Sequence, residues 1–177
     1  MDIFQLVEHI RSNEAAIEFL RQRGILRALD HPPLCPECGH EMSEARRESR
    51  GDGVVWRCQR SINGRQHKRQ ISIRKGLISY FSYLELETHN HHCILDSFLE
   101  KSNIEPRHFI VLAYTWAIGI SSAEQEIMTS LSKPTVIDWN QFFRDITSRQ
   151  LLAHPIQLGG PGTIVHIGLN YEFIMFL

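Results

Sequence analysis

Long hydrophobic runs are absent from this sequence. The longest apolar stretch, FIVLAYTWAIGI at 109–120, has twelve residues, whereas a membrane-spanning helix needs about 20. The opening MDIFQLVEHI lacks the basic cluster that begins a secretory signal. We therefore expect a soluble intracellular protein with no membrane partner.

Cysteine is also scarce, with four residues in a chain of 177. In a reducing compartment such residues are more readily metal ligands or buried side chains than disulfides. Two of them form the C-x2-C pair Cys35 and Cys38, with Pro36 after the first and Gly39 after the second. This pattern is typical of a tight knuckle that binds a metal ion from one side.

Basic residues are few outside a single block. Residues 44–75 contain ten of the 19 Lys and Arg residues and only three acidic ones, so this block carries +7 in a chain of net charge -1. Such a concentration of positive charge is typical of a site for a polyanion. A solvated basic face without a ligand remains the alternative.

The basic block also has the pattern of a β-hairpin. The runs GVVWRCQ and RQISIR are β-branched or alternating, and Asn63-Gly64 lies between them as a turn. Cys58 falls on the first strand and His67 on the second, which gives the spacing C-x2-C-x19-C-x8-H. A closed set of four ligands is typical of structural zinc. We therefore predict a zinc ribbon over 31–76 with the ligands Cys35, Cys38, Cys58 and His67.

Two other histidine-containing segments compete with this assignment. His40 is an alternative fourth ligand, although it lies too close to Cys38 to reach the far side of an ion easily. The cluster THNHHC at 88–93 resembles a chelator, but no framework surrounds it. Buried cysteines without metal remain the simplest alternative.

The remaining segments favour helices. Residues 1–30 predict a short helix at 2–10 and a second that Ser12 or Asn13 caps and Gly24 ends. Within a segment at 97–153, residues 106–150 predict three helices, with the capping box SSAE at 121–124 and the start SKPT at 132–135. A short helix, a tight turn and a longer helix indicate a helix-turn-helix, and a plain three-helix bundle is the alternative. The fold class is α+β and mostly helical.

A set of ordered motifs resembles one family. EAAIEFLRQRGIL, CPECG, WRC, SIRKG, SFLEKSNI, TVIDWNQFFRDI and GGPGTIVHI occur here in the order seen in Merlin-class transposases. These DDE-type enzymes of animal genomes are similar to certain bacterial insertion-sequence transposases. The resemblance covers 3–76 and 97–167. It implies a zinc ribbon and a helix-turn-helix that bind transposon ends, followed by an RNase H-like domain whose carboxylates bind catalytic metal ions.

The chain departs from that family at two places. The family pattern runs from SIR-x-G directly into S-F-F/L-E-x-S, whereas Leu77–Asp96 intervene here, so we predict that 77–96 is an insertion or a read-through intron. The family's first catalytic strand reads V-x-I-D-E, but Gly168 and Leu169 stand at the two acidic positions. We therefore expect 154–177 to hold only the first strand of a truncated RNase H-like domain, without catalytic residues.

The sequence thus predicts a nuclear, catalytically inactive, DNA-binding fragment of a transposase, with structural zinc. Its partner would be double-stranded DNA at transposon ends. The alternatives are a zinc-stabilised protein-interaction module that pairs with full-length transposase or forms a homo-oligomer, and part of an active DDE transposase. The residues expected to contact DNA are Arg57, Arg60, Arg65, Lys68, Arg69, Arg74, Lys75, Lys133, Thr135, Asn140, Gln141 and Arg144.

Overall fold

The computed structural model describes residues 2–47, 51–62, 64–75, 99–100 and 102–155. Within these residues the fold is α+β, with five helices and one three-stranded antiparallel sheet, which confirms the expected class. The chain divides into two compact units, Met1–Phe109 and Ile110–Leu177. The predicted insertion, the His-rich segment 88–93 and the expected RNase H-like strand lie outside the described residues.

Two short helices open the first unit. Helix α1 (Ile3–Ile10) begins at a capping box between Asp2 and Gln5. Helix α2 (Asn13–Gln22) is capped by Ser12, whose Oγ accepts a hydrogen bond of 3.1 Å from the backbone N–H of Ala15. This geometry decides between the two predicted caps, because Asn13 is already helical. The buried faces consist of Leu6, Ala16, Ile17 and Leu20.

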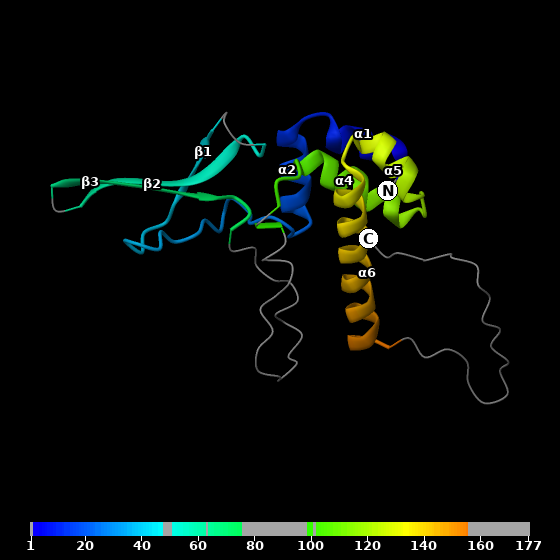
Figure 1. The fold of residues 1–177 in the computed structure, drawn as a ribbon. Coiled ribbons are helices and arrows are strands. Elements are labelled where there is room, and N and C mark those ends of the chain that lie inside the picture. The colour runs from blue at the N-terminus through cyan, green and yellow to red at the C-terminus, as the bar shows by residue number, and fades with distance from the viewer. Residues whose placement is uncertain (1, 48–50, 63, 76–98, 101, 156–177) are drawn as a thin grey trace. The chain divides into compact units, whose positions relative to one another are not determined.

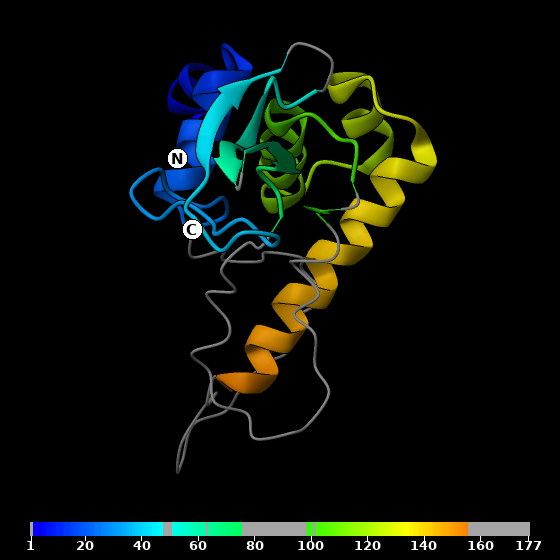
Figure 2. The same ribbon diagram turned by 90° about the vertical axis from the view of Figure 1, so that its left-hand side faces the viewer.

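The sheet has the order β1-β2-β3. Strand β2 (Val54–Ile62) pairs with β3 (Arg65–Ser72) from Val55↔Ser72 to Ile62↔Arg65. Gly64 has a φ of 75°, which suits the predicted tight turn because glycine has no Cβ to clash there. The hairpin of β2 and β3 projects as an arm, while α2 lies beside the opposite end of the sheet (Figures 1 and 2).

Strand β1 (Ser43–Arg46) was not predicted. Its sequence, SEAR, has neither β-branched residues nor alternating polarity, and its side chains are largely exposed. The strand forms because it pairs with Val54–Arg57 of β2. Its Glu44 makes an ion pair with Arg21 of α2, which joins the sheet to the helices.

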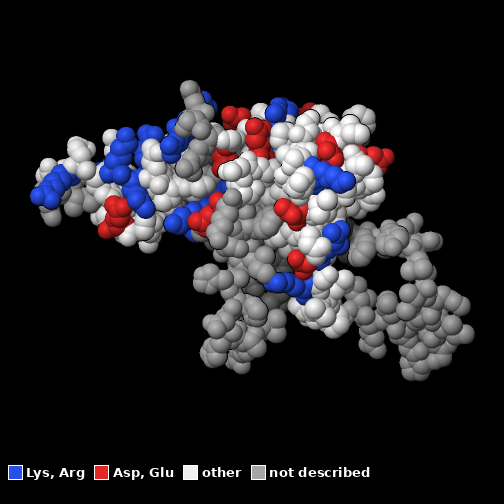
Figure 3. Space-filling view, in the orientation of Figure 1, with Lys and Arg blue, Asp and Glu red and all other residues white. Residues whose placement is uncertain are grey.

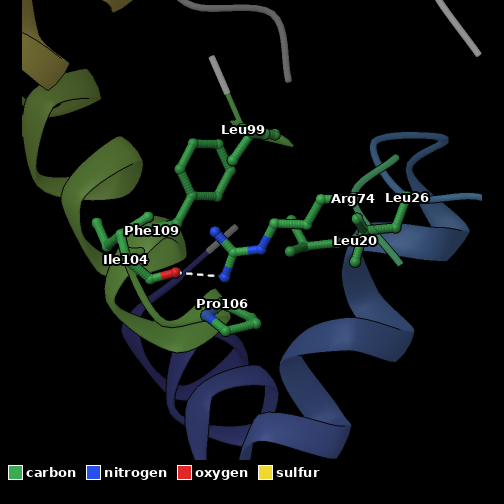
Figure 4. Close-up of a pocket in the computed structure, with 7 residues that line it drawn as sticks. All are labelled: Leu20, Leu26, Arg74, Leu99, Ile104, Pro106 and Phe109. Atoms are coloured by element: carbon green, nitrogen blue, oxygen red, sulfur yellow. Dashed lines mark hydrogen bonds between the residues drawn. The ribbon is translucent and has the colours of Figure 1, made fainter. Parts of the chain in front are cut away.

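Arg74 belongs to the interior of the first unit, although the sequence predicted it as a DNA contact. Its exposure is 6%, and its Nε lies 3.0 Å from both carboxylate oxygens of Asp52. Its guanidinium also donates to the carbonyl oxygens of Ser102, at 2.8 Å, and Ile104. This prediction is corrected, because the ion pair and these carbonyls occupy the side chain's donors. The apolar residues around it are Leu20, Leu26, Leu99, Ile104, Pro106 and Phe109 (Figure 4).

Helices make up the described part of the second unit. Helix α4 (Pro106–Ala117) begins in the first unit, and α5 (Ser122–Thr129) and α6 (Lys133–Ala153) follow it. Ser121 and Glu124 form the predicted capping box of α5. That helix ends at Thr129. The core contains Trp139 packed against Phe142 and Phe143, with ring centroids 5.4 and 5.8 Å away. None of the described helices is long and apolar enough to cross a bilayer.

Candidate metal centre

The knuckle at 33–42 is shaped by backbone hydrogen bonds. The N–H of Cys35 donates to the carbonyl of His40 at 2.7 Å, and the N–H of Gly39 donates to the carbonyl of Cys35 at 2.8 Å. Gly39 has a φ of 70°, a conformation that favours glycine. This turn follows directly from the sequence C-P-E-C-G, and it brings the thiols of Cys35 and Cys38 into one group.

The hairpin supplies the other two side chains of the cluster. Cys58 on β2 and His67 on β3 lie on the same face of the ladder, because Cys58 pairs with Arg69 and His67 pairs with Arg60. The Sγ atoms of Cys38 and Cys58 are 3.6 Å apart, and Cys35 Sγ is 3.3 Å from His67 Nε2. All four ligand atoms lie within 4.8 Å of one another.

These separations suit a tetrahedral metal ion. Zinc bonds of about 2.3 Å to sulfur and 2.0–2.1 Å to nitrogen put the edges of a tetrahedron at about 3.8 Å between sulfurs and 3.6 Å between sulfur and nitrogen. The cluster therefore could bind a metal ion such as zinc through four protein ligands, which leaves no open position for substrate. Its three thiols are free cysteines, not disulfides.

His40 is not part of the cluster. Its side chain is exposed, and its Nδ1 lies 3.0 Å from the carbonyl oxygen of Cys38. His67, by contrast, is 14% exposed in its side chain. The structure thus brings together the ligand set that the spacing predicted and sets aside its competitor.

Glu37 adds a residue that the sequence analysis missed. Its carboxylate lies 3.5 Å from His67 Nδ1 and 3.3 Å from a guanidinium nitrogen of Arg69. A carboxylate at the second nitrogen of a ligand histidine fixes the ring and directs the first nitrogen toward the metal. The sequence did offer a signal for Glu37, because it lies between Cys35 and Cys38. A residue inside a C-x2-C knuckle lies close to the metal-binding atoms.

Two of the thiols differ in acidity. Burial raises the pKa of Cys58 to about 11, and the neighbouring thiols of Cys38 and Cys35 add to this effect. Burial acts in the same direction on Cys35, but hydrogen bonds from the Glu37 backbone and from His67 outweigh it and lower its pKa to about 6. Near neutral pH a thiolate at Cys35 therefore lies beside a thiol at Cys58, and a bound divalent metal would displace the proton of Cys58.

The predicted DNA contacts on the arm fall into three groups. Arg60, Arg65, Lys68 and Lys75 are exposed. Arg69 is exposed but paired with Glu37, and Arg57 is half-buried with its Nε out of solvent. Lys and Arg side chains gather along the arm that carries β2 and β3 (Figure 3).

The predicted DNA contacts on α6 are also divided by burial. Lys133, Gln141 and Arg144 are exposed, whereas Thr135 is half-buried. Asn140 is 4% exposed, and its Nδ2 donates to Gln125 Oε1 at 2.7 Å and to Ser122 Oγ at 3.1 Å. The prediction for Asn140 is corrected, because this side chain joins α6 to α5 and does not reach the surface.

Comparison with known proteins gives no relative for the chain. No family model, no curated protein and no solved structure matches it.

Proposed function

We propose that this chain binds double-stranded DNA through a zinc ribbon at 31–76, as the DNA-binding fragment of a transposase of the Merlin class. The motif order supports the family, and the Cys3His cluster supports the ribbon. In this proposal zinc has a structural role, because four protein ligands hold the knuckle and the hairpin together. The partner is duplex DNA at transposon ends in the nucleus.

One observation carries the proposal. Arg60, Arg65 and Lys68 are exposed on the arm, and none of them makes an ion pair with a carboxylate among the described residues. Cations that the protein leaves unneutralised are the ones that can release counterions from a phosphate backbone. Arg74, by contrast, directs its charge at Asp52 inside the fold.

The helices of the second unit support a secondary role in DNA binding. Helices α5 and α6, joined by a short turn, are consistent with the predicted helix-turn-helix. The exposed surface of α6 carries Lys133, Arg144 and Arg149 but also Asp138 and Asp145. Because two carboxylates offset most of this positive charge, affinity in this proposal comes mainly from the arm.

The test is the salt dependence of duplex binding by the whole chain. Replacing Arg60, Arg65 and Lys68 together with Ala should weaken binding to every duplex. The slope of log K against log salt should flatten by about 0.9 for each phosphate that the variant no longer neutralises. Fluorescence anisotropy with a labelled duplex, from low to moderate salt, measures both quantities.

A control variant distinguishes DNA contacts made by the arm from attraction by the net charge of the chain. Replacing Arg11, Arg23 and Arg107 with Ala removes the same charge from exposed positions on or next to helices α1, α2 and α4, and should change the slope little. An equal effect in both variants would mean that net charge alone attracts DNA. A hairpin variant that binds like the parent at every salt concentration would contradict the proposal.

A second candidate is a zinc-stabilised module that pairs with full-length transposase. Exposed apolar side chains on α5 and α6 favour it: Ile127 is 81% exposed, Met128 57% and Ile137 46%. Such residues are common at protein interfaces. Binding of duplex DNA by the isolated chain with a steep salt slope supports the first candidate. Self-association without DNA binding supports the second.

Strand transfer is not part of the proposed function. In the family that the chain resembles, carboxylates position divalent metals at the scissile phosphate, and Gly168 and Leu169 occupy the first acidic positions. We expect no cleavage of labelled transposon-end duplex with magnesium or manganese. Cleavage that survives replacement of Glu124, Glu126 and Asp138 by Ala, with contaminating nuclease excluded, would place an active site elsewhere in the chain.

A further inference from the structure

We propose that one face of the β2–β3 hairpin enters the major groove of duplex DNA and reads base edges, with Gln59 and Gln66 as the adenine-contacting side chains. This inference rests on the proposed DNA binding and deepens it. It moves sequence recognition from α6, where the sequence predicted it, to the sheet.

The strand register separates the arm into two faces. Side chains alternate across a strand, and the register places Arg57 opposite Gln70, Gln59 opposite Lys68 and Ser61 opposite Gln66. These three cross-strand pairs share one face. Cys58 and His67 lie on the other, which carries the metal cluster and Glu37. We call the first set the outer face: Arg57, Gln59, Ser61, Gln66, Lys68 and Gln70.

The outer face has the chemistry of a groove-reading surface. Its six side chains are amides, a hydroxyl and cations, and none is acidic or apolar. Neither strand of the hairpin contains Asp or Glu, so a carboxylate on either face must come from elsewhere in the chain. The cluster face does include one, because Glu37 lies against His67 and Arg69. The outer face therefore offers the cation Lys68 to a phosphate and its amides to base edges, while Arg60 and Arg65 project from the cluster face.

Two of the outer-face amides are available for a ligand. Gln59 and Gln66 are exposed. Neither side chain has a hydrogen-bond partner among the described residues. Gln70 differs, because its Oε1 accepts from Arg47 Nη1 at 3.3 Å. A glutamine amide pairs with adenine through N6 and N7, both of which lie in the major groove.

The dimensions of the hairpin match the groove. Neighbouring strands lie about 4.8 Å apart, and a two-stranded ribbon fits the major groove, which is about 12 Å wide. Side chains on one face recur every two residues, about 6.8 Å along a strand. That interval is close to two base-pair steps of about 3.4 Å. Successive cross-strand pairs can therefore address alternate base pairs.

Helix α6 is poorly equipped for the same task. Its Asn140 is buried against α5. Its Gln141 donates to the carboxylate of Asp145 at 2.8 Å and accepts from Arg144 at 3.0 Å. A glutamine held beside a carboxylate would have to break those contacts and bring the negative charge near the phosphates.

The experiment begins with the full zinc-loaded chain and duplexes that carry a random core. Repeated selection gives the preferred sequence, and the measured quantity is the affinity ratio between that duplex and a scrambled duplex of the same composition. The Gln59→Ala/Gln66→Ala variant should lower this ratio at least about tenfold, the effect expected when base-reading amides are removed. Its salt slope should stay at the parent's value, since no charge is removed.

Matched variants and a modified base complete the test. Gln22→Ala/Gln150→Ala removes two exposed helical amides and should leave the ratio unchanged. Replacing adenine by 7-deazaadenine in the selected duplex removes the N7 acceptor, and should cost the parent affinity but not the Gln59→Ala/Gln66→Ala variant. Zinc content and circular dichroism of each variant verify that the hairpin is folded.

The outcomes distinguish this inference from the proposed function. If selection enriches no sequence although duplexes bind, or if Gln141→Ala abolishes the preference while the hairpin variant keeps it, base reading by the hairpin is wrong and DNA binding stands. Tighter binding to single strands than to duplexes also contradicts it. If no duplex binds at all, the proposed function itself fails.

Discussion

At the scale of single residues, the metal cluster depends on which histidine completes it. His67 lies across the hairpin from Arg60 on the face that carries Cys58, and its Nε2 approaches Cys35. His40 is nearer to the thiols in sequence, but it is exposed and lies at the carbonyl of Cys38. The structure thus places the candidate ligand His67 in the cluster and leaves His40 outside it, and the two histidines differ in where the backbone places them.

Zinc content tests this assignment. The parent should bind about one zinc ion per chain, and Cys58→Ser should abolish ordered binding. His67→Ala should weaken zinc binding strongly, whereas His40→Ala should retain it. Metal analysis after dialysis against a competing chelator measures the difference. Full retention in His67→Ala together with loss in His40→Ala would reverse the assignment.

Asn140 shows how burial changes the role of a residue. Its amide donates to Gln125 and Ser122, so truncation removes hydrogen bonds and leaves Gln125 Oε1 without this donor. Asn140→Ala should lower the free energy of unfolding by about 1–3 kcal/mol. Gln141→Ala, one residue along and exposed, should change it by less than about 0.5 kcal/mol. Urea denaturation followed by circular dichroism measures both, and equal effects would contradict the buried role.

At the scale of elements, helix α5 depends on its capping box. Ser121 Oγ accepts from the backbone N–H of Glu124, whose carboxylate accepts from the N–H of Ser121 at 3.1 Å. Hydrogen bonds from the Ser121 side chain and backbone lower the pKa of Glu124 below its usual value of 4.5. The ionised carboxylate is therefore the form that the folded helix favours.

The sign of the resulting pH dependence follows from that shift. The pKa of Glu124 is lower in the folded state. The ionised carboxylate therefore stabilises the fold above a pH of about 4.5, and this stabilisation is lost as the pH falls through the folded-state pKa. Glu124→Gln should therefore be less stable than the parent at pH 7, with the difference shrinking at pH 3. Thermal unfolding at both pH values measures this, with Glu126→Gln as the control outside the box. A difference that grows in acid would contradict the cap.

Strand β1 is an element that the sequence did not predict. The hairpin, the caps and the three C-terminal helices were predictable because turn residues, capping side chains and periodic apolar positions are local signals. SEAR carries no such signal, and its strand exists through pairing with β2. Glu37 was missed for a similar reason, since its role depends on a histidine about thirty positions away that the hairpin brings back.

At the scale of the whole molecule, contacts in the first unit hold the chain on both sides of the predicted insertion. Arg74 precedes Leu77–Asp96 and donates to the carbonyls of Ser102 and Ile104, which follow it. Leu99 lines the same pocket as Arg74 (Figure 4). All the residues that make these contacts lie outside 77–96.

Deleting Leu77–Asp96, with Gly76 joined to Ser97, should therefore preserve the first unit. Zinc content should stay at the parent's value. The free energy of unfolding should rise by on the order of 1 kcal/mol, because closing a shorter connection loses less conformational entropy. Arg74→Ala in the parent should instead cost about 3–5 kcal/mol, since it leaves Asp52 buried without its partner. Loss of zinc or of cooperative unfolding in the deletion variant would show that 77–96 belongs to the fold.

The sequence by itself determined the local features of this protein: the knuckle, the hairpin turn, the helix caps, the four candidate ligands and the basic block. Each depends on residues close together in the chain or on simple alternation. Only the tertiary structure decided which cations are exposed, because Arg74 and Lys75 look alike in sequence while one has Asp52 as a buried partner. It likewise buried Asn140 and left Gln59 and Gln66 exposed. Burial and pairing depend on residues distant in sequence, so composition and spacing could not determine them.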